Sequence, residues 1–173
     1  EVNGWKEGMR EEGLSALIDV QTQNRIPVVS EIMDASQINE FSMTAINVIQ
    51  VGTRNFQNYT LLDALGKLDK PILLKRGTWG TLDEILGACE RILEGGNDKL
   101  PALKKFTNIP IIYDPSHSTG YRDFVVPISK AAMAAGADGL IVECHPDPPN
   151  SISDADQAIG IEELKEIMEY VNG

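Results

Sequence analysis

Polar and charged side chains stand at or directly after the ends of five short apolar runs in this sequence. In parallel α/β proteins the active site forms at the carboxyl ends of the strands, so residues in these places are candidates for chemistry. Each one alone could be an ordinary polar loop residue, but the same pattern after all five runs favours a shared site. The candidates are Glu31, Thr53, Arg54, Lys75, Asp114, His117 and Glu143.

Two of these candidates are cations. Arg54 and Lys75 follow apolar runs directly, where an anion such as phosphate or carboxylate would need partners. The chain as a whole has a formal net charge of −11, which argues against nucleic acid or an anionic membrane as a partner. We therefore expect an anionic small molecule held by a few local cations.

A second group has the composition of a metal site. His117, Glu143 and Asp154 offer one imidazole and two carboxylates, a donor set that suits a divalent ion such as Mn, Fe, Co or Zn. His145 follows Glu143 by two residues and would share its strand face. It is therefore either a competing ligand or a residue that supports the ligands.

The cysteines indicate the compartment. Cys89 and Cys144 cannot form a disulfide framework and match no CxxC zinc pattern, so a reducing cytoplasm is expected. Cys144 is predicted to face away from Glu143, and Cys89 to lie in a helix core. The start Glu1–Arg10 shows no leader pattern, and no apolar window approaches the ~18 residues of a membrane span.

Apolar runs alternate with segments of helical period along the chain. This alternation predicts the α/β class, with a parallel sheet covered by helices, and no domain boundary within residues 1–173. The predicted strands are Ile26–Ile32, Ala45–Thr53, Pro71–Lys75, Ile109–Tyr113 and Gly139–Cys144. The predicted helices are Leu14–Gln23, Leu61–Leu68, Thr81–Leu93 and Asp123–Ala135.

The alternation fails at one place. The helix Thr81–Leu93 ends at a Gly-Gly-Asn signal, yet the next segment, Leu100–Phe106, has helical rather than strand character. Either the fold contains an irregular helix pair, or residues are missing between about Asn97 and Leu100. We favour missing residues.

Four stretches of the sequence together resemble the 3-deoxy-heptulosonate 7-phosphate (DAHP) synthase family in its shorter microbial type. They are Val48–Gln57 (VIQVGTRNFQ), Pro71–Gly77 (PILLKRG), Ile112–Asp123 (IYDPSHSTGYRD) and Gly136–Asp154 (GADGLIVECHPDPPNSISD). The resemblance extends from about residue 11 to 166, and its last two blocks are the specific ones. It implies a (β/α)8 TIM barrel that condenses phosphoenolpyruvate with erythrose 4-phosphate, the first step of the shikimate pathway to aromatic amino acids.

The resemblance also implies roles for individual residues. Arg54 and Lys75 would hold the phosphate and carboxylate of phosphoenolpyruvate, with Thr53 beside them. Glu31 would lie next to that substrate and help to order the attacking water. The metal ligands would be His117, Glu143 and Asp154, with Asp114 behind His117 as a further catalytic candidate. We also expect a homo-oligomer and no organic cofactor.

Three family features are not found. A GPC-type cysteine ligand and a KPRT-like motif for erythrose 4-phosphate would both precede residue 11. An arginine motif for the phosphate of phosphoenolpyruvate would fall between Gly96 and Leu100, where the alternation fails. Five strands are visible where a barrel needs eight, so part of the barrel, the N-terminal strands and one internal strand, is expected to be missing from this chain.

Two other functions compete with DAHP synthesis. A 3-deoxy-octulosonate 8-phosphate synthase would share the barrel, phosphoenolpyruvate and a segment like Glu94–Asp98 (EGGND), although the Asp114–Ser118 block is closer to the heptulosonate group. A non-catalytic barrel remnant, acting as a regulatory or partner subunit, would explain the missing motifs. The retained cations and metal-type residues oppose it.

Overall fold

The computed structural model describes residues 9–96 and 110–173. By its internal contacts the chain divides into two compact units, Glu1–Pro101 and Ala102–Gly173, and each is described by itself. Whether they form the single domain expected from the sequence remains a prediction.

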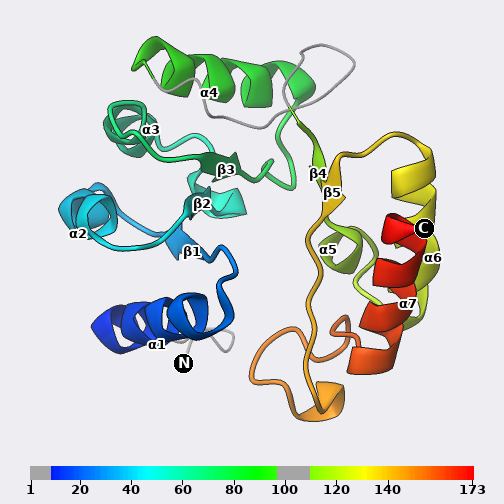
Figure 1. The fold of residues 1–173 in the computed structure, drawn as a ribbon. Helices are drawn as coiled ribbons and strands as arrows, with labels where there is room; N and C mark the ends of the chain where they lie inside the picture. Colours follow the sequence, from blue (N-terminus) through cyan, green and yellow to red (C-terminus); the bar gives the residue numbers. More distant parts are fainter. Residues whose placement is uncertain (1–8, 97–109) are drawn as a thin grey trace. The chain divides into compact units, whose positions relative to one another are not determined.

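The first unit contains a three-stranded parallel sheet in the order β1-β2-β3. Its strands are β1 (Val29–Ile32), β2 (Val48–Val51) and β3 (Ile72–Leu74). Helix α1 (Arg10–Asn24) precedes β1, and α2 (Ile38–Met43) and α3 (Tyr59–Leu65) connect the strands (Figure 1). Helix α4 (Leu82–Glu94) follows β3. Short 3-10 turns, η1 (Ala35–Gln37) and η2 (Thr53–Asn55), follow the first two strands.

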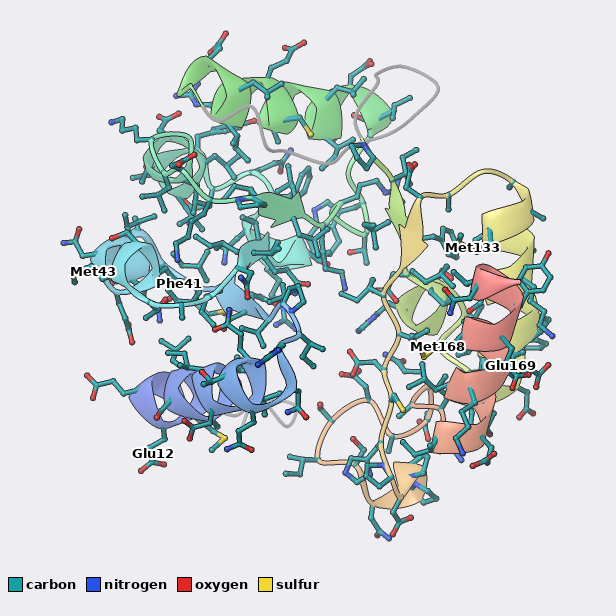
Figure 2. All side chains as sticks on the ribbon, in the orientation of Figure 1. Glu12, Phe41, Met43, Met133, Met168 and Glu169 are labelled. Carbon is teal, nitrogen blue, oxygen red and sulfur yellow. The ribbon has the colours of Figure 1, made fainter. Side chains whose placement is uncertain are left out.

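One face of this sheet forms the core. Side chains alternate between the two faces of a strand, and the buried set points toward the helices. Phe41 points from α2 toward the sheet and is 2% exposed, whereas Met43, two residues later, points away and is 82% exposed (Figure 2). The strand residues of the buried set are Ile32, Ile49, Val51, Ile72 and Leu74.

Two contacts hold α3 against α4. Arg91 donates to the Asp63 carboxylate through Nε at 2.7 Å and Nη2 at 3.0 Å, which lowers the pKa of Asp63. The helices end at a close backbone approach, because a Cβ on Gly95 would lie 2.7 Å from the Gly66 backbone. Only glycine fits such a crossing without movement of the main chain.

The second unit contains a short parallel pair, β4 (Ile112–Tyr113) and β5 (Gly139–Leu140). Its helices are α5 (Pro115–Thr119), α6 (Arg122–Ala134) and α7 (Ile161–Asn172), with a 3-10 turn, η3 (Pro148–Asn150). Helices α6 and α7 lie side by side (Figure 1), joined by an ion pair of 2.7 Å between Lys130 and Glu166. Their core is Val125, Ile159 and Ile167.

The predicted parallel α/β class is confirmed, and each predicted strand overlaps an observed one. The four predicted helices correspond to α1, α3, α4 and α6. The sequence reading did not identify α2, α5 or the terminal helix α7. The described strands form an open three-stranded sheet and a separate pair rather than a closed barrel. None of the described helices has both the length and the apolar composition that a membrane span requires.

Candidate active site

His117 is presented by a short helix whose start is fixed by its sequence. Asp114 is the N-cap of α5, and Pro115 occupies the first turn, where its missing N–H costs nothing. One oxygen of Asp114 accepts the backbone N–H of His117 at 3.0 Å, and the other lies 2.8 Å from His117 Nδ1. When Nδ1 carries the proton for Asp114, the Nε2 lone pair is available to a metal.

Glu143 lies in an extended segment just beyond β5. Its carbonyl accepts the N–H of Ile159 at 2.9 Å, and the neighbouring Cys144 forms a parallel bridge with the same residue. Cys144 packs against the core of the second unit, as expected from its place one residue after Glu143. Burial and the charge of Glu163 raise the pKa of the Cys144 thiol, which disfavours the thiolate needed of a metal ligand.

Asp154 occupies the left-handed region of backbone conformation, with φ of 55°. Such a conformation is uncommon outside glycine and needs support from the surrounding structure. The Asp154 carbonyl accepts the N–H groups of Gln157 and Ala158, and Gln157 Nε2 donates to Asp154 Oδ1 at 2.9 Å.

Arg122 holds the loop that follows Asp154. Its Nε donates to the carbonyl of Ala158 at 2.6 Å, its Nη2 to that of Ala155 at 2.8 Å, and its backbone N–H to that of Asp156 at 2.9 Å. A guanidinium supplies several donors in a fixed plane, which suits a clamp across main-chain carbonyls.

The structure brings the three predicted metal-type residues together. His117 Nε2 lies 3.9 Å from Glu143 Oε1 and 4.0 Å from Asp154 Oδ1, and one donor atom from each residue lies within 4.8 Å of the others. Ligands about 2.0–2.2 Å from a common ion are roughly 3–4 Å apart. The donor types therefore suit a divalent ion, and the distances of 3.9 and 4.0 Å from His117 Nε2 lie at the upper end of this spacing.

His145 does not join this cluster in the described structure. Its Nδ1 lies 2.7 Å from the carbonyl oxygen and 3.0 Å from the backbone nitrogen of Asp147, two residues further on. It therefore contacts its own loop, and a place among the metal ligands is not favoured.

In the first unit, Glu31 lies on the sheet face opposite the core. Its Oε2 accepts from Gln50 Nε2 at 2.9 Å, and the parallel register places these two residues opposite each other. A Cβ on Gly52 would lie 2.0 Å from Glu31 Oε1. The glycine that follows β2 thus makes room for the Glu31 carboxylate.

Arg54 is exposed in η2, on a loop that is fixed on both sides. Its neighbour Asn55 donates from Nδ2 to the carbonyl of Met33 in the loop after β1, at 3.1 Å. Phe56 is 2% exposed and packs against Gly77 in the loop after β3, so closely that a Cβ there would lie 2.1 Å from its ring. The loops after all three strands are thereby interlocked around Arg54.

Lys75 continues the β2–β3 ladder, with its backbone N–H donating to the carbonyl of Val51 at 3.0 Å. Arg76, the next residue, instead turns back onto its own loop and donates to the carbonyl of Gly80 at 3.0 Å. Arg54 and Lys75 thus follow the carboxyl ends of the neighbouring parallel strands β2 and β3, and Glu31 is the next-to-last residue of β1. Thr53 opens the same turn as Arg54.

The other cysteine has no place in this site. Cys89 is buried in α4, and burial raises the pKa of its thiol to about 11. Such a thiol is inert as a nucleophile near neutral pH. The core role predicted for Cys89 agrees with this environment.

Sequence reasoning missed several residues that hold the candidate residues within each unit, above all Asn55 and Phe56 in the first unit and Arg122 in the second. One signal could have identified Arg122. A cation in the first turn of a helix is disfavoured by the helix dipole, so its presence there calls for another partner. For Asn55 and Phe56 the sequence holds no comparable signal, because their partners lie on other loops.

Comparison with known proteins identifies the family. The model of the DAHP synthetase I family matches residues 1–102 and 98–173 of this chain. The chain belongs to this family. A phospho-2-dehydro-3-deoxyheptonate aldolase of Thermotoga maritima is 36% identical over 94% of this chain and 55% of its own length. A 2-dehydro-3-deoxyphosphooctonate aldolase of Desulfotalea psychrophila is 30% identical over 90% of this chain and 66% of its own length.

A solved structure agrees with this assignment. The crystal structure of the T. maritima DAHP synthase superposes with a TM-score of 0.90 at 34% identity, covering 96% of this chain and 56% of that chain. A structure described as a truncated form of the T. maritima synthase gives a TM-score of 0.87. This chain thus spans about half the length of the T. maritima synthase that it matches.

The alignment also bears on the chain break expected between Asn97 and Leu100. That segment lies outside the described residues, as does the helix-like segment Leu100–Phe106. The two family-model matches overlap at residues 98–102. The alignment with the T. maritima aldolase extends over 186 positions, whereas this chain has 173 residues. That relative therefore has internal residues without a counterpart in this chain.

Proposed function

We propose that the full-length protein is a metal-dependent DAHP synthase, which condenses phosphoenolpyruvate, erythrose 4-phosphate and water to DAHP and phosphate. The observation that carries the proposal is the convergence of His117, Glu143 and Asp154 within 4.8 Å of one another, in a member of this family. We also propose the (β/α)8 barrel as the fold of the full-length protein. The TM-score of 0.90 to the T. maritima synthase supports it.

His117, Glu143 and Asp154 would hold the divalent ion. When bound there, the ion supplies Lewis acidity toward the aldehyde oxygen of erythrose 4-phosphate. Asp114 contacts His117 through both carboxylate oxygens, so we assign it to orienting that imidazole rather than to moving a proton of the substrate.

Arg54 and Lys75 would bind the phosphate and carboxylate of phosphoenolpyruvate, with Thr53 beside them. Fixed cations both orient the enol for attack on the aldehyde and stabilise negative charge that develops as phosphate leaves. The interlocked loops around Arg54 support this role, since they fix the backbone that carries this exposed side chain.

Glu31 is the remaining candidate for handling protons. Its carboxylate is held by Gln50 at 2.9 Å, on the sheet face opposite the buried core of the first unit. In this position Glu31 would order the water that adds to the second carbon of phosphoenolpyruvate and take up its proton.

Substrate choice tests this proposal. We expect the full-length protein to consume phosphoenolpyruvate faster with erythrose 4-phosphate than with arabinose 5-phosphate, measured as loss of phosphoenolpyruvate under matched conditions. The higher identity to the heptonate aldolase, 36% against 30% for the octonate aldolase, supports this order. Equal or reversed rates would move the assignment to 3-deoxy-octulosonate 8-phosphate synthesis.

A further inference from the structure

Ser116 has an unusual environment for a polar residue. Among the described residues, Ser116 and Ser129 are the two polar side chains classed as buried, and each is 0% exposed. The Ser129 hydroxyl donates to the carbonyl of Val125, one turn earlier in its own helix, at 2.6 Å. The Ser116 hydroxyl instead accepts the backbone N–H of Glu143, a residue 27 positions further along the chain, at 3.0 Å.

This long-range bond joins the backbones that carry two candidate metal ligands. Ser116 precedes His117 directly, and its own carbonyl accepts the N–H of Gly120, which closes the short helix α5. On the other side, the Glu143 carbonyl is held by Ile159. Both main-chain polar groups of Glu143 are therefore fixed, one by Ser116 and the other by Ile159.

The Ser116 hydrogen bond can affect metal binding through the position that it gives to Glu143. A divalent ion tolerates only small departures of its ligands from about 2.0–2.2 Å, so the placement of Glu143 relative to His117 determines how well both can bind at once. Outer groups that orient ligands commonly change metal affinity by ~10–100-fold when they are removed. The Ser116 hydroxyl is buried and directed at the backbone of a ligand, which is the geometry of such a group.

We propose that Ser116 is a positioning residue of the metal site: its hydroxyl sets Glu143 against His117 and thereby raises the affinity for a divalent ion. This rests on the metal site of the proposed function. It differs from a purely structural role, in which loss of the hydroxyl would lower stability without changing metal binding.

The test measures Mn²⁺ binding to the metal-free full-length protein. Titration gives the affinity, and the electron paramagnetic resonance spectrum reports the surroundings of the bound ion. Ser116→Ala should weaken Mn²⁺ binding by ~10–100-fold and alter the spectrum. Ser129→Ala is the matched control, since it removes an equally buried hydroxyl of the same unit, and it should bind Mn²⁺ as the wild type does. Thermal unfolding without metal would measure the structural cost of each variant.

A second pair covers the case in which Ser116→Ala does not fold. Ser116→Thr keeps the hydroxyl, whereas Ser116→Val has nearly the same shape without it. We expect the Thr variant to bind Mn²⁺ more tightly than the Val variant. Equal affinities for this pair, or wild-type affinity and spectrum for Ser116→Ala, would overturn the proposal for Ser116.

The two proposals fail in different ways. If wild-type protein does not bind Mn²⁺, or if His117→Ala binds it normally, the metal site itself is wrong and the inference about Ser116 falls with it. If the wild type binds and His117→Ala does not, the site stands. Only then do the Ser116 variants decide the role of this hydroxyl.

Discussion

The Asp114 carboxylate contacts His117 through both of its oxygens. Oδ1 accepts the backbone N–H at 3.0 Å and Oδ2 lies 2.8 Å from the imidazole Nδ1. The first contact starts the helix that carries His117, and the second turns the ring so that Nε2 is directed at Glu143 and Asp154. One side chain thus fixes both the backbone and the ring of a candidate metal ligand.

Replacing Asp114 should therefore weaken the metal site. We expect Asp114→Asn to reduce Mn²⁺ affinity of the full-length protein by ~10–100-fold, because the amide retains a helix cap but loses the charge that favours the Nδ1–H form of His117. Titration calorimetry would measure it. The control is Asp123→Asn, which replaces an exposed carboxylate early in α6. Unchanged affinity in Asp114→Asn would show that the imidazole needs no such partner.

Arg122 offers a second test of how the site is built. Its three donors hold the loop after Asp154, whose φ of 55° requires outside support. Arg122→Lys keeps the charge but cannot span two carbonyls in a fixed plane, so we expect weaker Mn²⁺ binding by roughly the same ~10–100-fold. Arg91→Lys changes a similar bidentate contact in the first unit and should leave Mn²⁺ affinity unchanged. If Arg122→Lys and Arg91→Lys bound Mn²⁺ with equal affinity, the Arg122 contacts would have no role in metal binding.

Much of the first unit could be predicted from the sequence because its signals are local. Apolar runs and helical periods identified its strands and helices α1, α3 and α4, and positions at or directly after the ends of the runs identified Glu31, Arg54 and Lys75. Helix α7 of the second unit was not predicted, although its apolar residues follow a helical period. The metal-type residues were found from their chemistry and the family blocks, and the structure supplied their distances.

The supporting contacts could not be predicted, because each depends on two segments meeting in space. From the sequence, Ser116 is an ordinary residue at a helix start, and only the structure shows its contact with Glu143. In the same way Phe56 is an ordinary core residue, and only the structure shows Gly77 against its ring. The role of His145 was also left open by the sequence. Spacing alone placed it on the same strand face as Glu143, but the extended segment turns at Pro146 and its ring contacts the Asp147 backbone instead.

The contact of Phe56 with Gly77 leads to a prediction for substrate binding. A Cβ at Gly77 would lie 2.1 Å from Phe56 Cε1, so Gly77→Ala must displace the ring and the loop that holds Arg54. We expect the KM for phosphoenolpyruvate to rise by about 10-fold or more, since small misplacements of binding groups are costly. Steady-state kinetics of the full-length protein would measure it.

Gly87 supplies the control for this substitution. It lies in the middle of α4, where an added Cβ meets nothing within 4 Å. Gly87→Ala should leave the kinetics unchanged and stabilise the protein by about 0.5–1 kcal/mol, because alanine loses less backbone freedom in a helix. If Gly77→Ala kept the KM of the wild type, the loops would not be interlocked in the way that the structure indicates.

The most direct test of a metal-dependent synthase is the release of phosphate from phosphoenolpyruvate in the presence of erythrose 4-phosphate, measured on chelator-treated full-length protein before and after Mn²⁺ is added. Chelator should abolish the release, and Mn²⁺ should restore it in the wild type and largely in His145→Ala, whose imidazole lies outside the cluster. His117→Ala should stay inactive, since no other described side chain can supply its nitrogen ligand. Activity that ignores the chelator, or a normal rate in His117→Ala, would contradict the account, and no activity under any condition would favour a non-catalytic member of the family.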